Sequence, residues 1–361
     1  MSQTSTAPVA TGSSAPGPRR AERSRRMPTW APGACFVAAA VVVGALWPVF
    51  DLNIALFVLY TVVLGTLAVY LLTRTLEGPR RATDRLVTCV VYSAFGLAMV
   101  PLVSLVWEVV RRGSTRLDGE FFNSSLVGVV GEGGGAYHAI LGTLIVTGIT
   151  TLISVPIGLL TAIYLVEYGT GRLKKAITFF VDVMTGIPSI VAGLFAFALF
   201  TLLFGNDVRL GLMGAAALSV LMIPVVVRSC EEVLKLVPNE LREASYALGV
   251  PKWRTVVKVV IPTAIAGLGT GITLAVARVV GETAPLLITV GLITGTNLNP
   301  FDGRMATLPV FAYYQLTQPG TDTQAFLDRA WTAALVLIIL VMVLNVVARL
   351  ISRFFAPKTG R

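Results

Sequence analysis

The stretch 243-EASYALGVPKWRTVVKVVIP-262 lies between two of the most apolar parts of a 361-residue chain, yet it carries charged residues, a glycine and two prolines. Hydrophobic residues make up 55% of the chain and charged residues 13%, and the mean hydropathy is +0.79. Soluble domains have a less apolar composition than this. The sequence therefore predicts an integral membrane protein in which this stretch is a polar interruption.

Apolar runs long enough to cross a hydrocarbon core of ~30 Å at ~1.5 Å per residue recur along the chain. They are continuously apolar and lack the alternation of lipid-facing strands, so we expect an all-α, polytopic bundle of about eight transmembrane helices. The expected spans are residues 31–50, 52–72, 86–110, 137–167, 176–204, 208–228, 259–296 and 331–355.

The distribution of basic residues predicts the orientation of these spans, because Lys and Arg favour short cytoplasmic loops. With the N-terminus inside, 22 of the 29 Lys and Arg residues fall in cytoplasmic segments, six are external and Arg278 lies within a span. The opposite orientation inverts this ratio. We therefore expect both termini in the cytoplasm of a bacterial cell, with the chain in the plasma (inner) membrane and the stretch 243–262 on the cytoplasmic side.

Composition divides the chain further. The first segment is rich in Ser, Pro, Gly and Arg and reads as a disordered basic tail; the alternative of a signal peptide is disfavoured because no A-x-A site follows the apolar run. The expected organisation is a cytoplasmic tail (1–30), N-terminal transmembrane helices (31–110), an external loop (111–136), a transmembrane core (137–355) with a cytoplasmic loop at 229–258, and a cytoplasmic C-terminal tail (356–361).

Signals for enzymatic chemistry are scarce. No G-x-x-x-x-G-K-[ST] loop is present, so nucleotide energy would have to come from another subunit. The three cysteines and the single histidine, His138, have no metal-ligand spacing, and we expect no metal, no cofactor and a solvated or interfacial His138. The net charge of +10 is explained by topology, so nucleic acid is not an expected partner.

The opening stretch predicts two short helices. Residues 238–248 form the first, Gly249 occupies the left-handed position that ends it, and Pro251 begins the second. The residues expected on one face of the first helix, at spacings of three and four, are Leu241, Ala244, Ser245 and Leu248. This face suits docking into a groove of a partner. An amphipathic loop lying flat on the membrane is the alternative.

The spacing of Glu243, Ala244 and Ser245, then Gly249, then Val259, Ile261 and Pro262 resembles the cytoplasmic EAA loop of ABC importer permeases. Ser245 and Val259 depart from that pattern by small changes in volume. The resemblance implies that Glu243, Ala244, Ser245, Leu248 and Gly249 belong to a coupling helix seated in a cleft of an ATPase subunit.

Further segments resemble the A-type permease subunit of phosphate importers (PstA-like). They include "TGIPSIVAGLFAF", "RVVGETAPLL" and "NPFDGRMATLPVFAYYQLTQPG", and the resemblance covers residues 120–355, the family's six-helix core. It leaves two additional N-terminal helices outside that core. It implies a complex with a second homologous permease, two ATPase subunits and an external phosphate-binding protein, with phosphate as the substrate.

"RVVGETAP" supplies the candidate substrate path. Arg278 and Glu282 are four residues apart, which on a continuous helix places them about 40° apart around the axis and ~6 Å apart along it. A charge within a span costs at least ~2.5–3.5 kcal/mol and usually faces the bundle interior. The arginine fork suits phosphate oxygens, and the glutamate can serve as its partner while the path is empty. A structural or snorkelling ion pair is the alternative. The resemblance implies a functional role for Arg278, Glu282 and the adjoining Thr283, and Gly281 and Pro285 allow the helix to break there.

The sequence leaves three alternative functions to be considered. A permease for another oxyanion such as sulphate would share the coupling loop. A secondary transporter or channel would need no coupling helix. A membrane enzyme would need an intramembrane catalytic pair, which the sequence does not display. The predicted function is therefore a permease subunit, not an enzyme, in an ATP-driven importer of inorganic phosphate.

Overall fold

The computed structural model describes residues 27–50, 53–206 and 208–355 of the chain. It contains two compact units, residues 1–104 and 105–361, which are treated separately below. Most of the predicted N-terminal tail and all of the predicted C-terminal tail lie outside the described residues.

The first unit is built on a pair of apolar helices, α1 (Ala31–Phe50) and α2 (Ile54–Leu76), followed by the start of α3 (Pro79–Gly113). Gly65 of α2 allows the close approach of α1, because a Cβ atom at this position would lie 2.5 Å from the ring of Phe36. Near the other end of α2, the backbone N–H of Met27 donates a hydrogen bond to Glu77. Small residues at the contact are a common device where two helices pack within a membrane.

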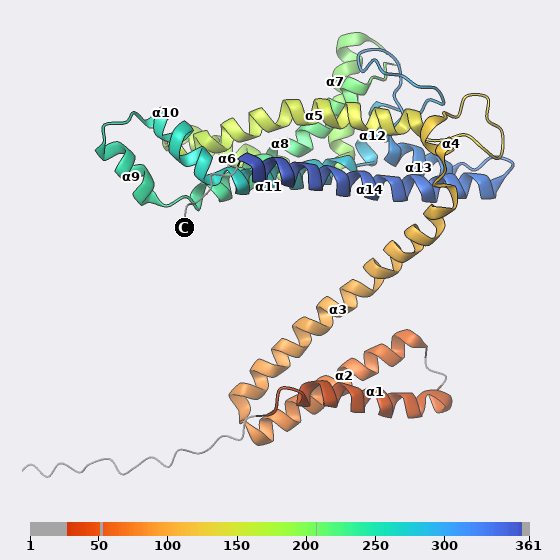
Figure 1. Ribbon diagram of the computed structural model, residues 1–361, viewed down its shortest axis with the longest axis vertical. Coiled ribbons are helices and arrows are strands. Elements are labelled where there is room, and N and C mark those ends of the chain that lie inside the picture. The colour runs from red at the N-terminus through yellow and green to blue at the C-terminus, as the bar shows by residue number, and fades with distance from the viewer. Residues whose placement is uncertain (1–26, 51–52, 207, 356–361) are drawn as a thin grey trace, which may run out of the picture. The chain divides into compact units, whose positions relative to one another are not determined.

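The second unit is a bundle in which α5, α8, α11 and α14 lie side by side (Figure 1). Its core is the contact of α5 with α8, where Gly158 lies against Val226. Among the described residues, a π-helical segment (Tyr164–Tyr168) follows α5 and another (Val256–Val260) precedes α11. A 3-10 turn spans Ser114–Arg116. The helices of this unit after α3 are α4 (Gly119–Asn123), α5 (Tyr137–Ile163), α6 (Gly171–Thr185), α7 (Ser189–Phe204), α8 (Gly211–Lys235), α9 (Asn239–Ala247), α10 (Lys252–Thr255), α11 (Ile261–Val280), α12 (Ala284–Thr289), α13 (Leu308–Thr317) and α14 (Thr323–Phe355).

The expected all-helical membrane fold is confirmed. Within the described residues, six helices are long and apolar enough to cross a membrane, the bent pair α6 and α7 can supply one more span, and α1 is a shorter apolar helix. Each expected apolar run therefore overlaps with at least one of these helices. The chain is an integral membrane protein of the polytopic helical class.

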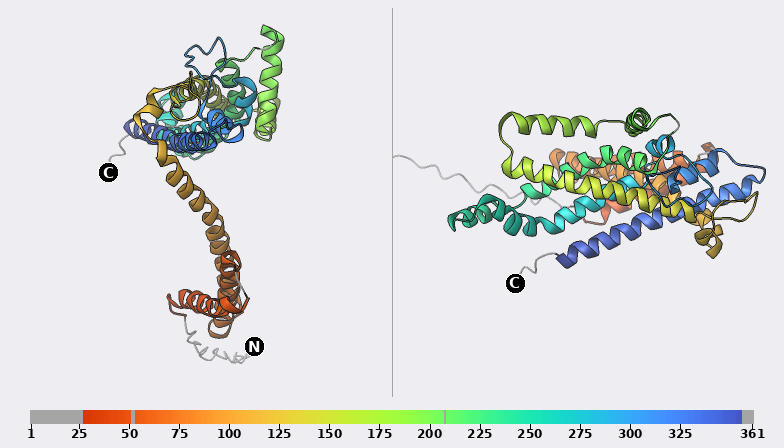
Figure 2. Two further views of the ribbon diagram at one scale, coloured as in Figure 1. Left: turned by 90° about the vertical axis from the view of Figure 1, so that its right-hand side faces the viewer. Right: turned by 90° about the horizontal axis from the view of Figure 1, so that it is seen from above.

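The expected span over 176–204 is not one straight helix. The structure breaks it between Thr185 and Ser189, and α6 meets α7 at an angle of 106°. In the right-hand view of Figure 2, α6 is seen from the side and α7 nearly end-on. Pro188 explains the break, because it cannot donate a backbone hydrogen bond and it disfavours the helical conformation at Ile187.

The expected span over 259–296 is also interrupted, at the place that the sequence suggested. Helix α11 ends at Val280, residues 281–283 are non-helical, and Pro285 lies in the first turn of the short helix α12. The remaining residues up to 307 form a loop that is pinned to the bundle, where Gly142 of α5 contacts the backbone of Ala306.

His138 is buried, so the expectation of a solvated or interfacial histidine is wrong. Its side chain is 2% exposed in the first turn of α5 and meets the ring of Phe311 edge to face. Neither ring nitrogen has a hydrogen-bond partner among the described residues. The packing of α5 against α13 accounts for the burial, which a single sequence does not reveal.

Candidate functional site

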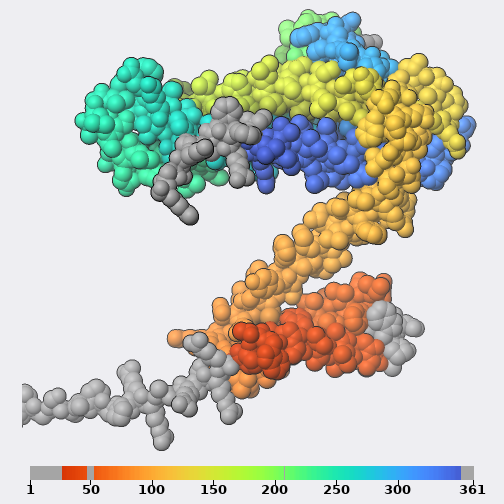
Figure 3. All heavy atoms as spheres, viewed as in Figure 1, coloured from red at the N-terminus to blue at the C-terminus, as the bar shows by residue number. Residues whose placement is uncertain are grey.

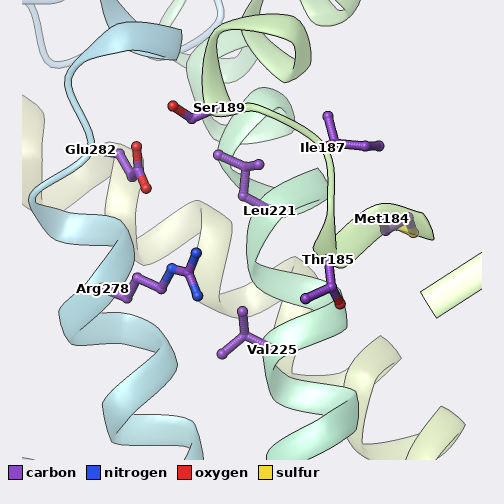
Figure 4. Close-up of a pocket in the computed structure, with 8 residues that line it drawn as sticks. All are labelled: Met184, Thr185, Ile187, Ser189, Leu221, Val225, Arg278 and Glu282. Atoms are coloured by element: carbon purple, nitrogen blue, oxygen red, sulfur yellow. The ribbon is translucent and has the colours of Figure 1, made fainter. Parts of the chain in front are cut away.

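The break between α6 and α7 and the end of α11 face each other across a cavity of about 160 Å³ (Figure 4). The cavity lies between three parts of the second unit: the α6–α7 junction, the middle of α8 and the end of α11. Its lining residues are Met184, Thr185, Ile187, Ser189, Leu221, Val225, Arg278 and Glu282.

Arg278 and Glu282 both line this cavity, although not for the reason that their spacing suggested. Because α11 ends at Val280, Glu282 lies beyond the helix and the four-residue spacing on a helical face does not apply. Figure 4 shows the guanidinium reaching into the cavity and the Glu282 carboxylate above it. Among the described residues, the Arg278 side chain has no hydrogen-bond or ion-pair partner. The cavity therefore presents an arginine whose donors are available.

The N-terminus of α7 opens onto the same cavity through Ser189. The first backbone N–H groups of a helix have no partner within that helix, and the helix dipole places a partial positive charge there. Pro188 therefore does more than bend the chain, since it turns the positive end of a 16-residue helix toward Arg278. The site therefore contains the Arg278 guanidinium, the positive end of α7 and the Glu282 carboxylate.

Thr283 is not brought into this cavity. It precedes α12, and its hydroxyl lies 3.5 Å from the carbonyl oxygen of Gly281. It lines a separate, largely apolar pocket of about 270 Å³ between α13 and α14, together with Tyr313 and Trp331. The non-helical turn thus points Glu282 and Thr283 toward different spaces.

The predicted pair of short helices is present and lies at one end of the second unit, where α9 and α10 form a protruding surface (Figure 3). Gly249 has a φ of +75°, as expected for the residue that reverses the chain after a helix. The backbone N–H groups of Gly249 and Val250 bond to the carbonyls of Tyr246 and Ser245. The turn that separates the two helices is therefore well ordered by backbone bonds.

The expected docking residues divide between two sides of α9. Glu243, Ala244, Leu248 and Gly249 are exposed, and Leu248 is 83% exposed. Ser245 is buried, and its hydroxyl lies 2.8 Å from that of Thr255 in α10. Ser245 therefore holds the two helices together from inside and does not belong to the outward face.

Sequence reasoning missed Arg242, which anchors α9 to the bundle. Its guanidinium donates to Glu167 at 2.8 Å and also to the backbone carbonyls of Leu234 and Val237. Both side chains of the ion pair are nearly buried, at 12% and 4% exposed.

A second ionic cluster ties α6 to α8. Arg228 bonds to Asp182 of α6 and to Glu231, which also bonds to Lys235. The Asp182 side chain is 60% exposed. The cluster fixes α6 next to the α8 segment that lines the cavity.

A bundle with an anion-compatible cavity and a protruding helix pair defines a membrane permease. A family model described as the inner membrane component of binding-protein-dependent transport systems matches residues 154–361. The phosphate transport system permease protein PstA 1 of Mycobacterium tuberculosis strain H37Rv is 48% identical over 291 residues, covering 80% of this chain and 93% of that protein. PstA of Pasteurella multocida is 36% identical and covers 78% and 97% of the two chains. The chain belongs to the binding-protein-dependent inner membrane components and, within them, to the PstA phosphate permeases.

Solved structures agree with this fold. A chain of a bacterial alginate ABC transporter, solved in complex with an alginate pentasaccharide-bound periplasmic protein, superposes with a TM-score of 0.54 at 14% identity. The match covers 77% of this chain and 97% of that chain. At this identity the likeness concerns the fold, which is that of an ABC importer permease.

Proposed function

We propose that this chain is a transmembrane permease subunit of an ATP-driven importer of inorganic phosphate. The observation that carries the proposal is the 48% identity to a phosphate permease over 93% of its length. The chain itself is a transport subunit, and a separate ATPase subunit hydrolyses ATP. Its partners are a second homologous permease, two ATPase subunits and an external phosphate-binding protein.

The Arg278 cavity supports an anionic substrate. Its guanidinium has no partner among the described side chains, and α7 directs its positive end at the same space. A planar guanidinium can bind two oxygens of one phosphate, and a carboxylate repels the same anion. In the proposed cycle, the Arg278 guanidinium binds phosphate in one state and pairs with the Glu282 carboxylate in another. The carboxylate competes with phosphate for the arginine, so the anion is not held too tightly.

The exposed face of α9 supports coupling to an ATPase. Leu248 and Ala244 project from a short helix at the end of the bundle, and an exposed leucine of this kind suits a groove in a partner. Arg242 transmits movement of α9 to α5 and α8, because its contacts include Glu167 and the end of α8. The consequence is alternating access, in which ATP-driven movement of α9 opens the cavity to one side and then to the other.

The orientation follows from the coupling role. An ATPase is intracellular, so the proposal locates α9 in the cytoplasm, and the distribution of basic residues supports a location of both termini on the same side of a bacterial inner membrane. The loops before α5 and after α12 then face the external binding protein.

Purification in mild detergent followed by reconstitution tests the proposal. We expect an ATPase, a second permease and a phosphate-binding protein to co-purify with the chain. In proteoliposomes, the assembled complex should take up radiolabelled phosphate only when ATP is present on the ATPase side. Uptake that excess unlabelled sulphate abolishes as effectively as unlabelled phosphate would contradict the substrate, and uptake without ATP would contradict the class.

A further inference from the structure

A pair of arginines converges at the end of α12 opposite to the Arg278 cavity. Arg209 precedes α8 and Arg304 lies in the loop after α12, so the two are far apart in sequence. Both lie against Gly291, because a Cβ atom built on this glycine would be 3.4 Å from Cδ of Arg209 and 3.5 Å from Cδ of Arg304. Gly291 has a φ of +68°, a backbone conformation that glycine adopts more readily than residues with a side chain.

The backbone around each arginine is fixed. The side-chain amide of Asn297 donates to the carbonyls of Asp302 and Arg304, at 2.7 and 2.9 Å. The backbone N–H of Met305 donates to the carbonyl oxygen of Val290, and the backbone N–H of Leu212 donates to the carbonyl oxygen of Pro300. The loop that carries Arg304 is therefore attached both to α12 and to the start of α8, close to Arg209.

Arg209 has a structural role as a cap of α12, whereas Arg304 has no such role. Arg209 donates to the carbonyl oxygens of Leu287 and Ile288 at the end of α12, where a cation is stabilised by the helix dipole, and it stacks over Phe197. Arg304 is exposed and caps nothing. Its side chain has no ion-pair or hydrogen-bond partner among the described residues, which do not include residue 207. Arg304 thus adds a positive charge next to a side chain whose guanidinium is already bonded to carbonyls, and an anion bound between the two side chains would offset their repulsion.

We infer that Arg209 and Arg304 form an outer oxyanion-binding position that receives phosphate before it reaches Arg278. The inference rests on the proposed function, which makes the substrate phosphate and places both arginines on the external side. Helix α12 connects the two positions, since Glu282 lies just before it and Gly291 just after it. Arg209 supplies a guanidinium positioned by its bonds to α12, and Arg304 supplies an exposed one that is available to the anion.

The alternative role for an exposed external arginine is docking of the binding protein, and uptake kinetics separate the two. The test measures radiolabelled phosphate uptake by the complete reconstituted complex over a range of loaded binding protein concentrations. For Arg304→Gln we expect the maximal rate to fall about tenfold, as for the loss of a charged hydrogen bond to the substrate. The binding protein concentration that gives half of this rate should not change. Arg304→Lys should recover part of the maximal rate because it keeps the charge.

Arg172→Gln is the matched control, since it removes one exposed arginine from the first turn of α6 and should leave uptake unchanged. An unchanged maximal rate for Arg304→Gln, with or without a higher half-saturating concentration, would overturn the outer position. So would an equal loss in the Gln and Lys variants or in the Arg172 control. Absence of phosphate uptake by the unmodified complex would instead overturn the proposed function, and this inference with it.

Discussion

Arg242 of the protruding helix α9 and Glu167 beyond the end of α5 form an ion pair of 2.8 Å, with both side chains nearly buried. The guanidinium also bonds to the carbonyls of Leu234 and Val237, so one side chain connects α9 to two helices of the bundle. A link of this kind is required if movement of a protruding helix is to reach the cavity.

The first prediction concerns this ion pair. Arg242→Gln should lower the stability of the complex by about 3–5 kcal/mol, because it leaves the Glu167 carboxylate buried without its partner. The double variant Arg242→Gln with Glu167→Gln should be less destabilised, since neither charge remains. Thermal unfolding and ATPase co-purification measure this, with Glu240→Gln as an exposed control on the same helix. A double variant as unstable as the sum of both singles would show that the pair is not coupled.

The second prediction concerns the turn after α9. Gly249→Val should impair coupling, because a β-branched residue at a φ of +75° is strained by about 1–3 kcal/mol. Gly249→Asn is the matched control, since asparagine tolerates this conformation better than other residues with a side chain. Membrane insertion should be normal in both variants. Full ATPase recovery and unchanged uptake in the valine variant, at matched expression, would refute the docking role of the turn.

The third prediction concerns Arg278. Arg278→Lys should reduce phosphate uptake nearly as much as Arg278→Ala, on the order of tenfold, because lysine keeps the charge but loses the planar fork. Assembly with the ATPase should remain intact, since Arg278 has no partner among the described side chains. Uptake at matched expression, with ATP hydrolysis recorded in parallel, is the measurement. Normal uptake with lysine would mean that only a positive field is needed, and normal uptake with alanine would place the substrate path elsewhere.

The fourth prediction concerns Glu282. Glu282→Gln should lower transport while ATP hydrolysis continues, because the anion then has no competing carboxylate to release it from Arg278. Glu282→Asp keeps the charge and serves as the control. Single-turnover release of labelled phosphate from the reconstituted complex measures the step directly. Faster release in the glutamine variant than in the unmodified complex would contradict the proposed exchange of partners.

Much of the fold follows from local rules. Continuous apolar runs predict the spans, and Gly249 and Pro251 predict the turn between α9 and α10, because such signals depend on a few neighbouring residues. The break near Gly281 was also foreseeable from the glycine and Pro285.

The remaining features depend on contacts between distant segments. The burial of His138 requires α13, and the inward side of Ser245 requires Thr255 of α10. The same limit applies to the Arg278 cavity, whose shape depends on how sharply Pro188 bends the chain. Spacing alone suggested an Arg278–Glu282 pair on one helical face, whereas the helix ends between them.

The bend between α6 and α7 also relates this protein to the thickness of its lipid environment. Helices of 15 and 16 residues are about 22–24 Å long, shorter than a hydrocarbon core of ~30 Å. At 106° to each other, at most one of them can run along the bilayer normal. Figures 1 and 2 show that α6 runs along the bundle with the long helices, whereas α7 lies across them. A bilayer that matches the 15 residues of α6 is thinner than ~30 Å, so acyl chain length becomes a variable that acts on the helix whose last residues, Met184 and Thr185, line the cavity.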